Sequence, residues 1–311
     1  MKAIPDPNSD SPRGLAFAIG AYVLWGFLPI YMKSLAALGP FEIIAHRIIW
    51  SLPVAAVVLL WQHRSAEVLT ALRTPRLLAM AALTACLITA NWLIYVWAVI
   101  NDRAIEAALG YYINPLFSIF LGAVLLGERL NRMQKLAVAL AALAVIILTL
   151  DAGKLPLVAI GLTFSWGIYA YCKKSLPLGP NQGFTLEVLM LTPLALGYVI
   201  WLQASGQGHF TESSTTMLLL LGCGPVTAIP LMLYANGAKL VRLSTIGVLQ
   251  YIAPTMIFLT AVFVFGEPFG GAQLIAFPLI WMALIIYSIT LIREAGRRRK
   301  SRRDLASHRA Q

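Results

Sequence analysis

A succession of long stretches without charged residues is the feature that most limits how this chain can fold. Residues 14–32 and 77–101 carry no charge, and comparable stretches recur as far as residue 292. A helix needs about 20 apolar residues, in a range of roughly 17–25, to cross the bilayer core. We therefore predict an all-α polytopic membrane protein with ten transmembrane helices, near residues 14–33, 41–61, 77–100, 104–126, 132–150, 155–173, 185–202, 216–236, 244–265 and 270–292.

The composition excludes soluble and disordered classes of protein. Of the 311 residues, 59% are hydrophobic and 12% are charged, whereas a soluble domain carries roughly 25% charged residues. The three cysteines, Cys86, Cys172 and Cys223, lie in apolar stretches without paired spacing, which predicts buried thiols and neither a disulfide framework nor a zinc motif. The connections are too short for another domain, so the function is expected to lie within the bilayer.

The net charge of +11 is an orientation signal. With the N-terminus inside, the cytoplasmic side receives 20 of the 24 Lys and Arg residues, while Lys33, Arg103 and Lys154 face outward and Arg47 lies within a helix. This asymmetry follows the positive-inside rule and places both termini in the cytoplasm. We expect residues 1–13 to be disordered and the basic tail, residues 293–311, to meet anionic lipid instead of nucleic acid.

The two halves of the chain repeat each other. Trp25-Gly26 recurs as Trp166-Gly167 at an offset of 141, and Tyr112-Ile113 recurs as Tyr251-Ile252 at an offset of 139. The predicted repeats span residues 14–150 and 155–292, with five helices each. Because five is odd, the repeats cross the membrane in opposite directions, as in secondary transporters that bind substrate near the midplane between their halves.

Polar residues at the start of the second predicted helix are candidates for substrate binding. Glu42 and His46 are four residues apart and share a helix face, while Arg47 lies one position round. A charge at membrane depth costs about 2.5–3.5 kcal/mol on insertion scales, so such residues normally face a cavity or a partner. The trio could bind a carboxylate or polar solute, with His46 relaying a proton. The alternative is a helix cap with an internal ion pair, which suits Glu42 best.

Two further groups complete the predicted substrate site. Asn91, Trp92 and Tyr95 lie in the third predicted helix, where an amide needs a hydrogen-bonding partner. The second group comes from the fourth and ninth predicted helices, in which prolines free backbone carbonyls, and it comprises Tyr111, Tyr112, Asn114, Gln250 and Tyr251. The alternative for both groups is helix packing, with the prolines acting only as kinks.

The sequence offers no catalytic constellation. It contains no Walker A loop, no HExxH pair and no Gly-x-Ser-x-Gly elbow. We therefore expect no enzyme activity, no cofactor and no bound metal, and a small solute moved by alternating access down or against a gradient. The competing hypothesis is a non-transporting membrane interaction protein whose basic tail binds lipid or a partner. The oligomeric state is left open.

Several segments carry a family resemblance. They include EIIAHRIIWS at 42–51, ALGYYINPLFS at 108–118 and GVLQYIAPTMIFL at 247–259. In these segments the chain resembles the RarD-type permeases of the EamA branch of the drug/metabolite transporter superfamily. The resemblance implies a ten-helix fold of two EamA repeats in the bacterial inner membrane. It also implies a permease associated by name with chloramphenicol sensitivity, whose physiological substrate is poorly defined.

Overall fold

The described secondary structure of the chain is helical throughout. A computed structural model describes residues 11–125, 131–153, 155–238, 240–241 and 249–309. Its helices are α1 (Pro12–Lys33), α2 (Pro40–Trp61), α3 (Ser65–Leu72), α4 (Pro75–Ile100), α5 (Ala104–Leu125), α6 (Arg132–Ala152), α7 (Leu157–Ser175), α8 (Pro180–Ala204), α9 (Ser214–Ala238), α11 (Ile252–Leu259) with the π-helix η1 (Thr260–Val264), and α12 (Gln273–Arg309). Proline opens α1, α2, α4 and α8, where its missing N–H would lack a helical partner anyway.

The described helices confirm an all-helical membrane protein. Among the residues described, seven helices are long and apolar enough to cross a bilayer, namely α1, α2, α4, α6, α8, α9 and α12. Shorter apolar helices cover 157–172 and 252–264. Apolar side chains such as Trp61 and Leu150 are exposed on the outside of the bundle, as lipid-facing residues must be.

Four segments differ in detail from the prediction. α1 begins at Pro12, two residues before the predicted first span, while residues 1–10 of the expected disordered N-terminus lie outside the described residues. The connection 62–76 contains the short helix α3, because Val68 and Ala71 find an apolar cluster to bury against. The span expected at 244–265 is interrupted by a turn at Gln250 and Tyr251, just before α11. The basic tail continues α12 as a helix to Arg309.

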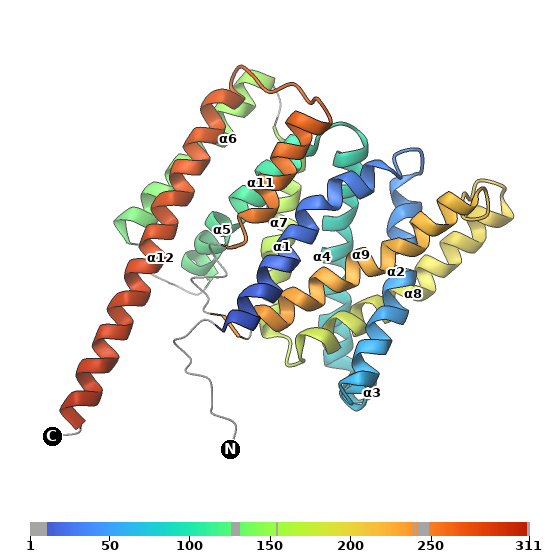
Figure 1. Cartoon of the computed structure of the whole chain (residues 1–311), viewed down its shortest axis with the longest axis horizontal. Helices are drawn as coiled ribbons and strands as arrows, with labels where there is room; N and C mark the ends of the chain where they lie inside the picture. The colour runs from blue at the N-terminus through green and yellow to red at the C-terminus, as the bar shows by residue number, and fades with distance from the viewer. Residues whose placement is uncertain (1–10, 126–130, 154, 239, 242–248, 310–311) are drawn as a thin grey trace.

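The helices pack mainly on helices far away in the sequence (Figure 1). α2 packs on α8 and α9, α1 packs on α9 and α11, and α7 packs on α4 and α5. α6 and α12 form a pair at one edge of the molecule, on the left of Figure 1, and reach the other helices chiefly through α5. α1 begins and α12 ends toward the same side of the molecule, the lower side in Figure 1.

Glycines set the closest approaches between helices. A Cβ on Gly224 of α9 would overlap the backbone oxygen of Trp50 in α2, and one on Gly110 of α5 would lie 2.9 Å from the carbonyl oxygen of Ala159 in α7. Lipid offers no hydrophobic drive for helix association, so small residues that allow backbone contact stabilise such interfaces. Gly224 and Gly110 therefore hold α2 to α9 and α5 to α7.

Replacing Gly224 with alanine should destabilise the bundle, because the added methyl forces backbones apart. Overpacking typically costs about 1–3 kcal/mol. The matched control is Gly20→Ala in α1, where an added Cβ meets nothing within 4 Å. The free energy of unfolding, measured by titrating purified protein in mild detergent with SDS, should fall for Gly224→Ala and stay level or rise for Gly20→Ala. Equal stability of the two variants would contradict the assigned contact.

Candidate functional site

A cavity of about 120 Å³ lies among helices drawn from both halves of the chain. We call it the central cavity. Its lining comes from six membrane helices, from the turn before α11 and from α11 itself. The lining residues are Tyr22, Trp25, Leu28, Arg47, Asn91, Trp92, Tyr95, Tyr111, Asn114, Trp166, Thr227, Leu231, Tyr234, Gln250, Ala253, Pro254 and Ile257.

Arg47 brings a buried positive charge to this cavity. It is 3% exposed, its Nε donates to Oγ1 of Thr227 at 2.9 Å, and its guanidinium carbon lies 4.9 Å from the ring centre of Trp92. Its Nη1 has no hydrogen-bond partner among the described residues, and no described carboxylate lies within 4.0 Å of it. The indole face offsets part of the cost of burying this cation, by about 0.5–2 kcal/mol.

Asn91 ties three helices together beside the cavity. Its Nδ2 donates from α4 to the carbonyl oxygen of Leu162 at 3.1 Å and to Oγ of Ser165 at 2.9 Å, both in α7. Its Oδ1 accepts from the Tyr111 hydroxyl of α5 at 3.2 Å. The amide is thus satisfied on both sides, as burial in an apolar bundle requires. Asn91 fixes the position of Tyr111 at the cavity wall.

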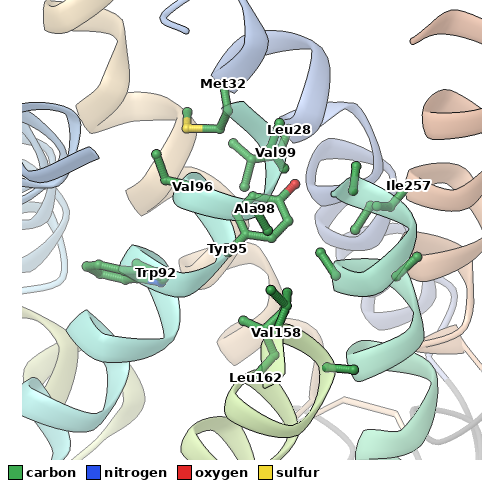
Figure 2. Close-up of a cluster of buried hydrophobic side chains, with 14 of the residues drawn as sticks. Leu28, Met32, Trp92, Tyr95, Val96, Ala98, Val99, Val158, Leu162 and Ile257 are labelled. Atoms are coloured by element: carbon green, nitrogen blue, oxygen red, sulfur yellow. The ribbon is translucent and has the colours of Figure 1, made fainter. Parts of the chain in front are cut away.

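Aromatic rings form much of the remaining wall. Tyr22, Trp25 and Tyr234 make a cluster with ring centres 5.6–5.8 Å apart. Tyr95 lies 5.8 Å from Tyr111, and its buried hydroxyl has no hydrogen-bond partner among the described residues. Figure 2 shows Trp92 and Tyr95 leaving α4 toward different sides, with Tyr95 directed toward the side where Ile257 lies. The wall combines flat apolar faces with a few polar groups, as ligand pockets generally do.

The turn that precedes α11 lies directly against the cavity. Gln250 in the turn, together with Ala253 and Pro254 in the first turn of α11, lines the wall. Non-helical backbone at membrane depth is tolerated where it is buried in protein or borders a polar space. The N-terminus of α11 also contributes the positive end of a helix dipole.

The structure brings together seven of the eleven residues proposed from the sequence. These are Arg47, Asn91, Trp92, Tyr95, Tyr111, Asn114 and Gln250. Glu42, His46, Tyr112 and Tyr251 do not line the central cavity.

The residues outside the cavity have other contacts. Glu42 accepts from the backbone N of His209 at 2.9 Å, and its Oε2 lies 2.7 Å from Nδ1 of that residue. His46 accepts from Nε1 of Trp50 at 3.0 Å and stacks on Phe210. Both residues therefore face the α8–α9 connection.

The two tyrosines are placed differently from each other. The Tyr112 hydroxyl donates to Oγ1 of Thr255 at 2.8 Å, inside a core that includes Phe277. Tyr251 is partly buried in the turn before α11, and its hydroxyl has no hydrogen-bond partner among the described residues.

Sequence reasoning missed several residues of the wall, above all Tyr22, Trp25, Trp166, Thr227 and Tyr234. The internal repeat could have found three of them, because it pairs Trp25 with Trp166 and Tyr95 with Tyr234. No sequence signal distinguishes Thr227 from other threonines in apolar helices.

The sequence reasoning also passed over a buried acid. Glu187 in α8 is 1% exposed and accepts from the Tyr169 hydroxyl at 3.4 Å. At the offset of 140 that pairs Pro53 with Pro193, Glu187 is the counterpart of Arg47.

Polar contacts connect helices at the end of the bundle where α1 meets α2 and α4 meets α5. The carboxylate of Glu267, after η1, accepts from the backbone N of Ala104 at 2.7 Å and of Ile105 at 2.9 Å, at the start of α5. Burial raises the pKa of the Glu267 carboxyl above its ordinary value, and the two backbone donors oppose that rise. Nearby, Lys33 and Asp102 form an ion pair at 2.5 Å.

An apolar helical bundle around a largely aromatic cavity that holds one buried cation has the architecture of a multi-pass membrane transporter. Comparison with known proteins agrees. The sequence pattern of the EamA-like transporter family matches residues 12–150. An uncharacterized transporter of Vibrio cholerae is 40% identical, over 97% of this chain and 100% of its own length. Protein RarD of Streptomyces exfoliatus is 41% identical, over 94% of this chain and 93% of its own.

A solved crystal structure shares the fold at lower similarity. It is 23% identical, with a TM-score of 0.60 over 92% of this chain and 99% of that chain. The chain therefore belongs to the EamA-like transporter family, as a RarD-type permease of the bacterial inner membrane.

Replacing Asn91 with leucine should loosen the contact of α4 with α7, because three hydrogen bonds are lost and Ser165 and Tyr111 lose a partner. We expect the free energy of unfolding in an SDS titration to fall by about 0.6–2 kcal/mol, the range measured for polar contacts between membrane helices. Tyr111→Phe removes one of these bonds at almost constant volume and should cost less. An Asn91→Leu variant as stable as the parent would show that the network contributes nothing.

Proposed function

We propose that the protein is a secondary-active permease that moves small metabolites or drug-like solutes by alternating access. Ten membrane helices form two inverted five-helix repeats, residues 14–150 and 155–292. The observation that carries the proposal is the composition of the cavity wall. Repeat-equivalent positions line it in pairs, namely Trp25 with Trp166, Trp92 with Leu231, Tyr95 with Tyr234, Tyr111 with Gln250, and Asn114 with Ala253. Two inverted halves that share one site can expose it to either side in turn.

Helix packing supports the same two-fold arrangement. Exchanging the proposed repeats exchanges α1 with α7, α2 with α8, α4 with α9, α5 with α11, and α6 with α12. Under this exchange the contact of α1 with α9 becomes that of α7 with α4, and the contact of α1 with α11 becomes that of α7 with α5. The α2–α8 and α6–α12 contacts map onto themselves. This pattern is what a pseudo-two-fold relation between the two proposed halves produces.

The distribution of basic residues supports an orientation with both termini in the cytoplasm. In that orientation the Glu267 and Glu42 contacts lie on the outer side. Each joins the two proposed halves, since Glu267 bonds the start of α5 and Glu42 bonds His209. These bonds close the outer side of the cavity, and they must break for the cavity to open outward.

Labelling of a cysteine in the cavity tests alternating access. In a chain whose native cysteines are replaced by alanine, Ala253→Cys should react with a membrane-impermeant maleimide from the cytoplasmic side, in inside-out vesicles. Adding Glu267→Ala removes the bonds to α5 and should raise the labelling rate from the outer side several-fold. Ala141→Cys, buried in α6 away from the cavity, is the unreactive control. Equal labelling from both sides with Glu267 intact would indicate an open pore and contradict the proposal.

We further propose that the basic tail, which extends α12, engages anionic lipid. Each basic residue near an anionic surface contributes about 1 kcal/mol. Removing residues 293–311 should leave solute flux in zwitterionic liposomes unchanged and abolish any increase that anionic lipid gives the full chain. Flux should be measured in both kinds of liposome. Loss of flux in both would instead favour an essential role of the tail in folding or partner binding.

A further inference from the structure

The central cavity contains two buried polar groups that no described residue satisfies. Nη1 of Arg47 and the hydroxyl of Tyr95 have no hydrogen-bond partner among the residues described, and these side chains are 3% and 2% exposed. Buried polar groups are normally hydrogen-bonded, so each exception needs an explanation. Because both residues line the same cavity, one ligand can supply the missing partner of both.

The formal charge on the described cavity wall is positive. Of the lining residues in the described part of the chain, Arg47 alone carries a formal charge. Its guanidinium is oriented by Thr227 and by the face of Trp92, and neither neutralises it. A guanidinium presents its donors in a planar fork that matches a carboxylate. The cavity is therefore complementary to an anion.

The remaining, mainly aromatic part of the cavity wall fits a small flat solute. A cavity of about 120 Å³ is close to the size that holds a single aromatic ring. Tyr22, Trp25 and Tyr234 present clustered ring faces, and aromatic rings pack favourably against one another in offset or edge-to-face arrangements. A substrate ring can stack on this cluster while its charged end reaches Arg47.

We propose that the permease takes small organic monoanions, with a carboxylate on an aromatic or compact apolar body and no amino group. Arg47 and Tyr95 bind the carboxylate, Thr227 positions the guanidinium, and the aromatic wall holds the body. The lining holds no carboxylate among its described residues, so a substrate ammonium group would face a buried cation without a counter-charge. This inference rests on the proposed function, whose site it uses.

Binding of three matched probes tests the substrate class. The probes are benzoate, its neutral amide and benzylamine, titrated calorimetrically into purified protein in lipid nanodiscs at neutral pH. Hydrogen bonds to charged groups are the stronger ones, so the carboxylate should bind about tenfold tighter than the amide or better, and the amine should bind most weakly. An amide that binds as tightly as the carboxylate, or an amine that binds tightest, would overturn the proposal. So would the absence of binding by all three probes at millimolar concentration.

Variants identify the residues responsible. Arg47→Gln should reduce the preference for carboxylate over amide to about one, and Arg47→Lys should retain part of it. Arg103→Gln is the matched control, since Arg103 pairs with Glu106 at a helix end, outside the cavity. Tyr95→Phe and Thr227→Val each remove a hydroxyl at nearly constant side-chain volume and leave Arg47 in place. Each should lower carboxylate affinity several-fold without changing amide affinity. They keep the test decisive if Arg47→Gln fails to fold. An unchanged preference in Arg47→Gln or in both milder variants would overturn the assignment.

The outcome separates this inference from the proposed function. If Ala253→Cys labelling changes side as alternating access requires while the carboxylate shows no preference, the substrate class is wrong and the permease mechanism stands. If the carboxylate binds through Arg47 but neither flux of benzoate nor a change in the labelled side occurs, the anion site stands and the transport mechanism is wrong.

Discussion

Hydrocarbon offers no hydrogen bonds to a polypeptide, and this constraint determines the arrangement of the molecule. Backbone groups must bond within each helix, so the chain crosses the membrane as helices. The helices then associate through close backbone contact, as at Gly224, and through bridging polar groups such as Asn91. The one described interruption within a predicted span, at Gln250 and Tyr251, occurs beside the central cavity, where irregular backbone can be accommodated.

The sequence predicted the class of protein more accurately than it predicted which residues each side chain contacts. Uncharged stretches were enough to predict an all-helical membrane protein, and segments such as 42–51 and 108–118 carried the resemblance to RarD-type permeases. Both are confirmed. Periodicity assigns a residue to a helix face, but the partner of that face depends on packing. Glu42, for example, bonds His209, which lies 167 residues away in the sequence. Arg47 directly follows His46 in the sequence, yet its Nε donates to Oγ1 of Thr227.

The turn within the ninth predicted helix could not be predicted, for a different reason. Residues 244–265 are uniformly apolar or uncharged, so hydropathy reads them as one span. The turn lies beside the cavity, and no hydropathy pattern records that neighbour. Trp25 and Trp166 illustrate the converse, since the repeat in the sequence pairs them while the glycine that follows each one, Gly26 and Gly167, is typical of a close helix contact. In the structure both line the cavity, because a wall for a small solute is built from the same residue types as a core.

The position of α6 and α12 has a consequence for how the family can diverge. These helices pack on each other at one edge and contact the remaining bundle chiefly through α5. None of the described cavity-lining residues belongs to them. Away from the rings of Phe277 and Trp281, which pack on Phe258 of α11, a substitution there alters chiefly the contact between the two helices and the contact with lipid. Among relatives, α6 and α12 should therefore accept substitutions faster than the other helices. Each proposed repeat would then contain four slowly changing helices and one that changes faster.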